Sequence, residues 1–144
     1  MNIGLDMMGG DFAPLEAVKG ASEYLTNATA GIHLTLIGDE VQINEHLANY
    51  PIPADKFTIV HAPEVIGMHE HPTKALKEKQ NSSIAIGFQL LATGKMDAFI
   101  SAGNTGAMMV GALFSIKTVE GLLRPTIGGY MPREDGTLGL LVDV

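Results

Sequence analysis

The sequence predicts an α/β fold in which a mostly parallel β-sheet is covered by helices on both faces, giving three α/β/α layers. Short apolar segments with strand composition alternate with segments whose apolar residues recur at helical spacing. The connections between these segments are short, as expected where helices link neighbouring parallel strands. With 144 residues, 46% of them hydrophobic, the chain can bury one core, so we expect a single domain over residues 1–144.

The first expected unit is a strand over residues 3–6, a loop with two adjacent glycines, and a helix. The strand ends on the carboxylate of Asp6, and Gly9 and Gly10 give the following loop unusual backbone freedom. Pro14 suits the first turn of a helix. That helix is indicated by apolar residues at helical spacing, namely Leu15, Val18, Ala21 and Leu25.

Two further strands and a second helix are expected next. Residues 32–38 have strand composition, and Asp39 is a favoured N-cap for a polar helix through about residue 48. Two prolines, Pro51 and Pro53, then break the chain. A third strand is predicted at residues 57–60.

The connection over residues 62–72 is longer than a plain link between two elements requires, which favours a role in a binding site. We expect a lysine-bearing helix after Pro72 and another helix after the capping residues Ser82 and Ser83. The apolar face of this other helix is formed by Ile84, Ala85, Phe88, Leu91 and Ala92.

A fourth strand, at residues 98–100, leads through a glycine turn into a helix that we expect to begin near Asn104. Few polar residues accompany the large apolar side chains of this helix. We therefore expect it to be buried on all sides, in the core or against another subunit. The side chains concerned are Met108, Met109, Leu113 and Phe114.

The end of the sequence predicts two more strands. We expect a turn at Arg124-Pro125, a strand at residues 127–131, and a hairpin turn at Glu134-Asp135-Gly136. The last strand is expected at residues 138–142, and the chain end over residues 140–144 has the apolar composition of a central parallel strand, with no turn or helix after it to cover the sheet. Residues 1–144 alone are therefore expected to expose this strand, and to aggregate or dimerise through it.

Composition and charge argue against several classes of protein. A net charge of −7 disfavours general nucleic-acid binding, and the absence of cysteine excludes disulfides and thiolate zinc sites. The longest apolar run, residues 107–116, is too short to span a membrane. The N-terminus lacks the basic leader and apolar stretch of a secretory signal, so we expect a cytoplasmic protein.

The loops after the first, third and fourth strands should share one rim, because parallel strands end at the same edge of a sheet. There Asn104 would cap a helix whose first amides are free, and Gly103 and Gly106 would let the backbone approach a ligand. Such a place attracts anions, phosphate above all. The alternative is plain turn-and-cap architecture, for which Gly-x-x-Gly before a helix is also typical.

Three blocks of sequence carry a family resemblance. They are residues 5–14 (LDMMGGDFAP), 71–83 (HPTKALKEKQNSS) and 101–107 (SAGNTGA). In this order they closely resemble signatures of the PlsX family, the acyl-ACP:phosphate acyltransferases of bacterial phospholipid synthesis, with Lys77 where an arginine is usual. The resemblance covers the whole chain but only about the first half of a family member. It implies that residues 1–144 are the N-terminal part of one enzyme domain, inactive without the remainder.

The resemblance implies transfer of a fatty acyl group from acyl carrier protein to inorganic phosphate, giving an acyl phosphate. It further implies the isocitrate/isopropylmalate dehydrogenase-like fold, a homodimer and no cofactor, and it leaves a peripheral attachment to the membrane open. Three rival functions remain: a phosphate acetyltransferase-like enzyme using acyl-CoA, a non-catalytic carrier-binding module, and a nicotinamide-dependent dehydrogenase. Against the last, no strand leads into Gly-x-Gly-x-x-Gly.

The same blocks supply the candidate site residues. We assign Lys77 and Asn104 as catalytic and Asp6 as a structural organiser that accepts hydrogen bonds from loop amides. Lys74, Lys77 and Lys79 could counter the charge of phosphate or carrier protein, although a solvated helix face is the alternative. Residues expected to bind phosphate or substrate are Gly9, Gly10, Asp11, Lys74, Ser82, Ser83, Ser101, Gly103, Thr105 and Gly106.

Some of these candidate residues need a closer assignment. Ser82 and Ser83 are better explained as helix caps than as nucleophiles, because no Gly-x-Ser-x-Gly elbow is present. Gly106 is expected to serve ligand approach, so that its replacement by valine should weaken phosphate binding at little cost in stability. No metal site is expected, because His69-Glu70-His71 lacks the His-Glu-x-x-His spacing.

Overall fold

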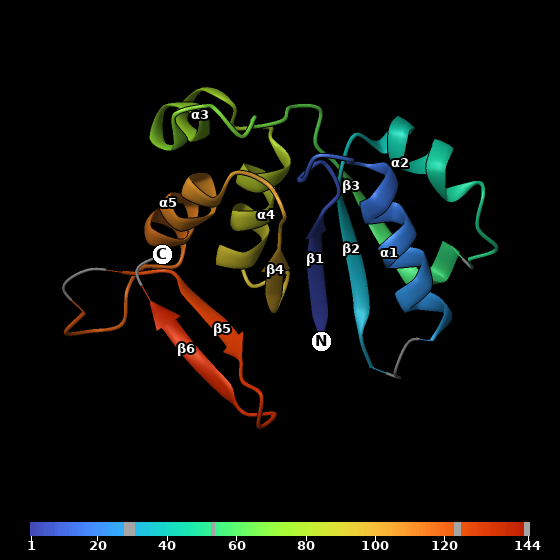
Figure 1. Ribbon diagram of the computed structural model, residues 1–144. Coiled ribbons are helices and arrows are strands. Elements are labelled where there is room, and N and C mark those ends of the chain that lie inside the picture. Colours follow the sequence, from blue (N-terminus) through green and yellow to red (C-terminus); the bar gives the residue numbers. More distant parts are fainter. Residues whose placement is uncertain (28–30, 53, 123–124, 143–144) are drawn as a thin grey trace.

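The computed structural model describes residues 1–27, 31–52, 54–122 and 125–142, and its centre is a four-stranded sheet. The strands are β1 (Asn2–Asp6), β2 (His33–Gly38), β3 (Phe57–His61) and β4 (Ala98–Ile100), in the order β3-β2-β1-β4. All three pairings are parallel; Ile3 of β1 lies opposite Leu34 of β2 and Ala98 of β4. The predicted α/β class with a mostly parallel sheet is therefore confirmed (Figure 1).

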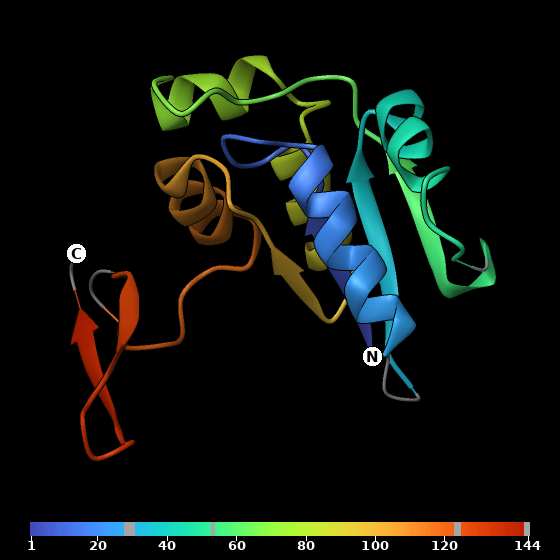
Figure 2. The same cartoon turned by 45° about the vertical axis from the view of Figure 1, so that its right-hand side comes forward.

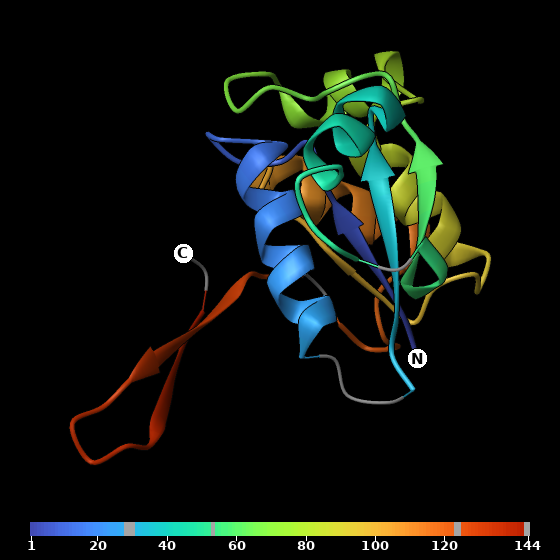
Figure 3. The same ribbon diagram turned by 90° about the vertical axis from the view of Figure 1, so that its right-hand side faces the viewer.

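Helices cover both faces of this sheet. They are α1 (Leu15–Thr26), α2 (Glu40–Leu47), α3 (Pro72–Glu78), α4 (Ser83–Ala92) and α5 (Thr105–Ser115), with a short 3-10 turn η1 (Ala54–Lys56) before β3. In Figure 3, α1 and α2 lie on the viewer's side of the sheet and α4 lies behind it. The sequence-based helices are thus present, with Asp39 and Ser82 accepting the capping hydrogen bonds of α2 and α4. Pro14 differs by one position, since it is the N-cap of α1 rather than its first residue.

Apolar packing follows the same division into two faces. On one face, Val18 and Ala21 of α1 and Ile43 of α2 pack against Leu34 and Leu36 of β2. On the other face, a cluster around Met96 and Ile37 packs beside α4, and a further cluster joins α3, α4 and α5. Phe88 and Phe99 meet there edge to face, with ring centroids 5.4 Å apart. This packing fixes where the loops at the carboxyl ends of the strands emerge.

The last strand differs from the sequence-based expectation. β6 (Leu138–Val142) pairs antiparallel with β5 (Gly128–Pro132) in a separate hairpin, so it is not a central parallel strand. The cause is local, because Asp135 Oδ1 accepts hydrogen bonds from the Thr137 amide (2.9 Å) and hydroxyl (2.6 Å) and tightens the turn. Figure 2 shows the hairpin standing apart from the four-stranded sheet. Its apolar side chains are exposed, as expected, with Leu140 at 66%.

Helix α5 is not buried on all sides, which corrects a second expectation. Ala107 and Gly111 are buried against α3 and α4, whereas Met109, Leu113 and Phe114 are 39%, 36% and 71% exposed. The reason is that, within the described part of the chain, the helices packed against α5 are α3 and α4, and the rest of its surface is left open. The expected turn at Arg124-Pro125 and the chain end at residues 143–144 lie outside the described residues, as does Pro53.

Candidate functional site

The loops that follow β1 and β4 touch at the carboxyl edge of the sheet. A Cβ atom added to Gly9 would lie only 2.6 Å from the Gly103 backbone nitrogen and 2.7 Å from Asp6 Oδ2. The two loops can approach this closely because Gly9 has no side chain. The expectation that these glycine-containing loops share one rim is therefore confirmed.

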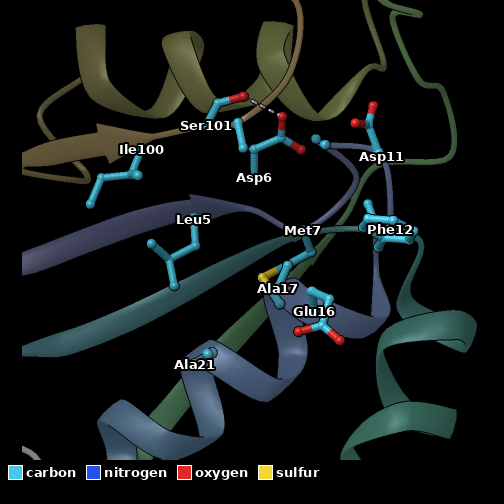
Figure 4. A pocket seen from close by; sticks show the side chains of 15 residues that line it. Leu5, Asp6, Met7, Asp11, Phe12, Glu16, Ala17, Ala21, Ile100 and Ser101 are labelled. Atoms are coloured by element: carbon cyan, nitrogen blue, oxygen red, sulfur yellow. Dashed lines mark hydrogen bonds between the residues drawn. The ribbon is translucent and has the colours of Figure 1, made fainter. Parts of the chain in front are cut away.

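A buried carboxylate joins the two loops. Asp6, 6% exposed, accepts a 2.9 Å hydrogen bond from the Met8 amide through Oδ1 and a 2.6 Å bond from the Ser101 hydroxyl through Oδ2. The Ser101 oxygen in turn accepts the Gly103 amide at 2.9 Å. Figure 4 shows Asp6 and Ser101 pointing toward one another from adjacent strands. This is the arrangement expected of a carboxylate that organises the loops.

Asn104 caps α5 and also anchors the loop that follows β3. Its Oδ1 accepts the Ala107 amide at 2.9 Å, and its Nδ2 donates toward the carbonyls of Gly67 (3.0 Å), Glu70 (3.1 Å) and Met68 (3.3 Å). The side chain is 4% exposed. Both polar atoms therefore have protein partners, which favours a role as cap and anchor over the catalytic role assigned from the sequence.

The first turn of α5 retains backbone donors for an anion. An α-helix provides no internal partner for its first amides, here those of Thr105 and Gly106, and its dipole adds positive potential at this end. Thr105 is exposed and Gly106 is half-buried. These two amides support the prediction that this turn binds phosphate, which stays a prediction.

Gly106 has a packing role that the sequence did not reveal. A Cβ at this position would lie 2.4 Å from Cγ of Pro72, at the start of α3. The missing side chain thus lets α5 pack against α3. The expectation that valine at this position would cost little stability is wrong, because the added side chain would meet a rigid proline ring.

The three lysines near α3 have different surroundings. Lys79 donates from Nζ to Glu70 Oε1 at 2.5 Å and to the Val65 carbonyl at 2.7 Å. This bond to Lys79, together with the Gly67 amide, holds the pKa of the Glu70 carboxyl below its ordinary value. Lys74 and Lys77 are exposed and have no ion-pair partner among the described residues. They are thus available to an anionic ligand, whereas Lys79 is engaged.

Ser82 and Ser83 lie inside the protein, at the start of α4. Ser82 is fully buried; its oxygen accepts the Ala85 amide at 3.3 Å and its hydroxyl donates to the Lys79 carbonyl at 2.7 Å. Ser83 is 2% exposed, and its amide donates to the Glu64 carbonyl at 3.3 Å. These contacts match the expected capping role for Ser82.

A pocket of about 430 Å³ opens beside the loop of residues 9–13. Its walls come from this loop, from α1 and from β4, and Figure 4 shows Leu5, Ala21 and Ile100 along its apolar side. Gly10, with φ of +101°, and Asp11 are exposed at its rim. The apolar wall was not assigned from the sequence, since small and aliphatic residues at helical spacing carry no signal beyond that of a core.

The described residues contain neither a metal site nor a membrane-spanning helix. No group of three or more histidine, aspartate or glutamate side chains could hold a metal ion among them. Glu70, the central residue of His69-Glu70-His71, instead accepts from Gly67 and Lys79. Within the same part of the chain, no helix is long and apolar enough to cross a membrane.

Known proteins match this chain over its whole length. A family model described as "Fatty acid synthesis protein" matches residues 1–144. The chain is 44% identical over all 144 residues to a phosphate acyltransferase from Dictyoglomus turgidum, of which it covers 42%. It is 45% identical over 141 residues, 98% of its length, to a phosphate acyltransferase from Pelotomaculum thermopropionicum, of which it covers 40%. It thus spans about two fifths of the length of these relatives.

A solved structure shares the fold. The EutD phosphotransacetylase from Staphylococcus aureus superposes with a TM-score of 0.63 and 21% sequence identity, over 96% of this chain and 44% of that one. At this identity the likeness indicates the fold alone. The family model, which extends over every residue, indicates descent: the chain belongs to the fatty acid synthesis protein family, and its resemblance to the PlsX phosphate acyltransferases is confirmed.

Proposed function

We propose that this protein transfers a fatty acyl group from the thioester of acyl carrier protein to inorganic phosphate, forming an acyl phosphate and the free carrier thiol. Membership of the fatty acid synthesis family and the names of the relatives support this reaction. The observation that carries it is the junction at the carboxyl edge, where Asp6 and Ser101 hold the Gly9 and Gly103 loops together beside the open first turn of α5.

The chemistry requires alignment more than a strong base. A phosphate oxygen attacks the carbonyl carbon of the thioester, the tetrahedral oxyanion collapses, and the carbon–sulfur bond breaks to release the thiolate. Phosphate is itself anionic near neutral pH and can act as the nucleophile directly. Backbone amides that are already oriented can hold the phosphate or stabilise the oxyanion without reorganising during the reaction.

The proposal includes roles for individual residues. We assign phosphate to the amides of Thr105 and Gly106, with Gly9, Gly10 and Asp11 bordering the site. Lys74 and Lys77, both exposed, supply positive charge toward phosphate or toward an acidic carrier protein in a chain whose net charge is −7. We assign no cofactor to the reaction.

Further proposals concern the assembly and the location. The full fold is proposed to be isocitrate/isopropylmalate dehydrogenase-like. Exposed apolar residues on α5 and on the β5–β6 hairpin, such as Phe114 and Leu140, support a homodimer. We place the enzyme in the cytoplasm, with peripheral contact to the membrane for which its lipid precursor is made.

The test is an assay with a palmitoyl thioester of acyl carrier protein and inorganic phosphate, carried out on the purified full-length enzyme because residues 1–144 alone are expected to be inactive. We expect release of the carrier thiol only when phosphate is present, with acyl phosphate detected by mass spectrometry. The same thioester of coenzyme A is the comparison. Faster phosphate-dependent turnover with the coenzyme A thioester would replace the proposed donor, and carrier binding without any thiol release would support a binding module instead.

A further inference from the structure

Three backbone carbonyls of the loop between β3 and α3 converge on the side-chain amide of Asn104, at the start of α5. Those of Gly67, Met68 and Glu70 lie 3.0, 3.3 and 3.1 Å from Asn104 Nδ2. An amide group has only two N–H bonds to share among three acceptors. Because carbonyl oxygens carry like partial charges, this convergence requires other contacts that hold the loop in shape.

One of those other contacts is the backbone hydrogen bond from the Glu70 amide to the Gly67 carbonyl at 3.1 Å, and the rest come from one ion pair. Glu70 Oε1 accepts the Gly67 amide at 2.6 Å and the Lys79 ammonium group at 2.5 Å. Lys79 also donates to the Val65 carbonyl at 2.7 Å. The pair therefore ties both ends of residues 65–70 together and attaches them to the chain beyond α3.

The exposure of the Glu70–Lys79 pair indicates whether it affects global stability or only the shape of the loop. The side chains of Lys79 and Glu70 are 33% and 37% exposed, and ion pairs in such positions contribute little to global stability. The partners of this pair, however, include backbone atoms of the loop that accepts the Asn104 amide. Its loss should therefore change the conformation of the loop more than the free energy of unfolding.

We propose that Glu70 and Lys79 are positioning residues that hold residues 65–70 in the shape required by Asn104, and thereby fix the first turn of α5. Lys79 then acts through Asn104 and does not touch phosphate. This inference rests on the proposed function for its kinetic consequence, and on the contacts alone for its conformational one.

The experiment compares Lys79→Met and Glu70→Gln with the wild-type protein, each prepared as the full-length enzyme. We expect faster hydrogen exchange of the amides of residues 65–70 and 105–107 in both variants. The KM for inorganic phosphate should rise roughly three- to tenfold, the size of one lost hydrogen bond, while kcat changes less than about twofold. Lys79→Arg, which keeps the charge and the donors, should restore both readouts in large part.

Lys95→Met provides the matched control, because Lys95 is an exposed lysine at the opposite edge of the sheet whose side chain has no ion-pair partner among the described residues. It should leave exchange and KM at their wild-type values. The double variant Glu70→Gln/Lys79→Met should be no worse than Lys79→Met alone, since Lys79→Met already removes the ion pair that Glu70→Gln only weakens by removing its negative charge.

Two results would overturn the inference. Unchanged exchange over residues 65–70 in Lys79→Met would show that the ion pair does not shape the loop. Faster exchange with an unchanged phosphate KM would show that the loop does not position the site. A wild-type protein without phosphate-dependent thiol release would instead refute the proposed function, and the exchange measurement would still decide the conformational role.

Discussion

The Ser101 hydroxyl donates a 2.6 Å hydrogen bond to Asp6 Oδ2, joining residues that are 95 positions apart in the sequence. Ser101 also accepts the Gly103 amide, so one hydroxyl group links the carboxylate after β1 to the turn before α5. Hydrogen bonds to a carboxylate are among the stronger ones in proteins. This relationship makes the junction of the two loops sensitive to a single oxygen atom.

Replacing Ser101 by alanine should therefore damage the junction. The change leaves the Gly103 amide and one buried carboxylate oxygen without a partner, which should cost about 1–3 kcal/mol in the free energy of unfolding. Urea denaturation measures this cost, and Ser115→Ala is the control, since the Ser115 hydroxyl has no hydrogen-bond partner among the described residues. Equal stability of the two variants would mean that the link between the loops contributes nothing.

Gly9→Ala should push the same two loops apart. The new Cβ would lie 2.6 Å from the Gly103 nitrogen and 2.7 Å from Asp6 Oδ2, and such overpacking typically costs about 1–3 kcal/mol. Phosphate affinity should fall with it, because the loops border the proposed site. The matched control is Gly20→Ala in α1, where a Cβ meets nothing within 4 Å and should stabilise the helix by up to about 1 kcal/mol. Thermal unfolding checks that the melting temperature falls in Gly9→Ala and rises in Gly20→Ala.

The sequence predicted those features of the fold that depend on local chemistry. Strand composition and helical spacing identified the parallel sheet and its helices, and the caps Asp39, Ser82 and Asn104 were predictable because each accepts an amide only three residues ahead. The expected parallel direction of the strands made the shared rim predictable as well, since the carboxyl ends of parallel strands meet at one edge.

Contacts made between distant elements were not predictable. The contact of Gly106 with Pro72 and the bond from Asn104 to Gly67 each join residues more than thirty positions apart. Glu70 and Lys79 lie on opposite sides of α3 in the sequence, so helical spacing gave no sign of their pairing. The hairpin is a different case: Glu134-Asp135-Gly136 correctly indicated its turn, but the apolar composition near the chain end wrongly indicated a strand of the central sheet.

The Glu70–Lys79 pair should make the loop of residues 65–70 sensitive to acid. The hydrogen bond from Lys79, and next that from the Gly67 amide, lower the pKa of Glu70 from its ordinary value of 4.5. Because the pKa is lower in the folded state, the carboxylate stabilises the loop fully at a pH above its unfolded-state pKa. This stabilisation is lost as pH falls through the folded-state value.

The stability of the loop of residues 65–70 should therefore differ between wild type and Glu70→Gln by a constant amount at neutral pH. The two proteins should become alike in this respect below about pH 4.5. Hydrogen exchange of residues 65–70, measured across this range, checks the convergence. Asp39 and Asp135, whose pKa values are also lowered by hydrogen bonds, are present in both proteins and cancel in the difference. A difference that persists unchanged into strong acid would show that the charge of Glu70 has no part in holding the loop.

Asn104→Asp separates the two roles of this side chain. Aspartate remains a good N-cap, because its carboxylate can accept the Ala107 amide and interacts favourably with the helix dipole. The same carboxylate replaces a donor by a negative charge facing the carbonyls of Gly67, Met68 and Glu70. If anchoring the loop matters more than capping, the variant should lose at least about 2 kcal/mol of stability, since buried polar groups are left unpaired.

The reverse substitution at another cap is the control for this prediction. Asp39→Asn in α2 keeps an oxygen that can accept the Gln42 amide, and its exposed surroundings contain no comparable set of carbonyls, so stability should change by less than about 0.5 kcal/mol. Urea denaturation compares the two variants, and hydrogen exchange locates the loss. Exchange in Asn104→Asp should quicken over residues 65–70 while the α5 amides beyond Ala107 stay protected. Wild-type stability and exchange in this variant would show that capping alone explains why Asn104 is buried at this position.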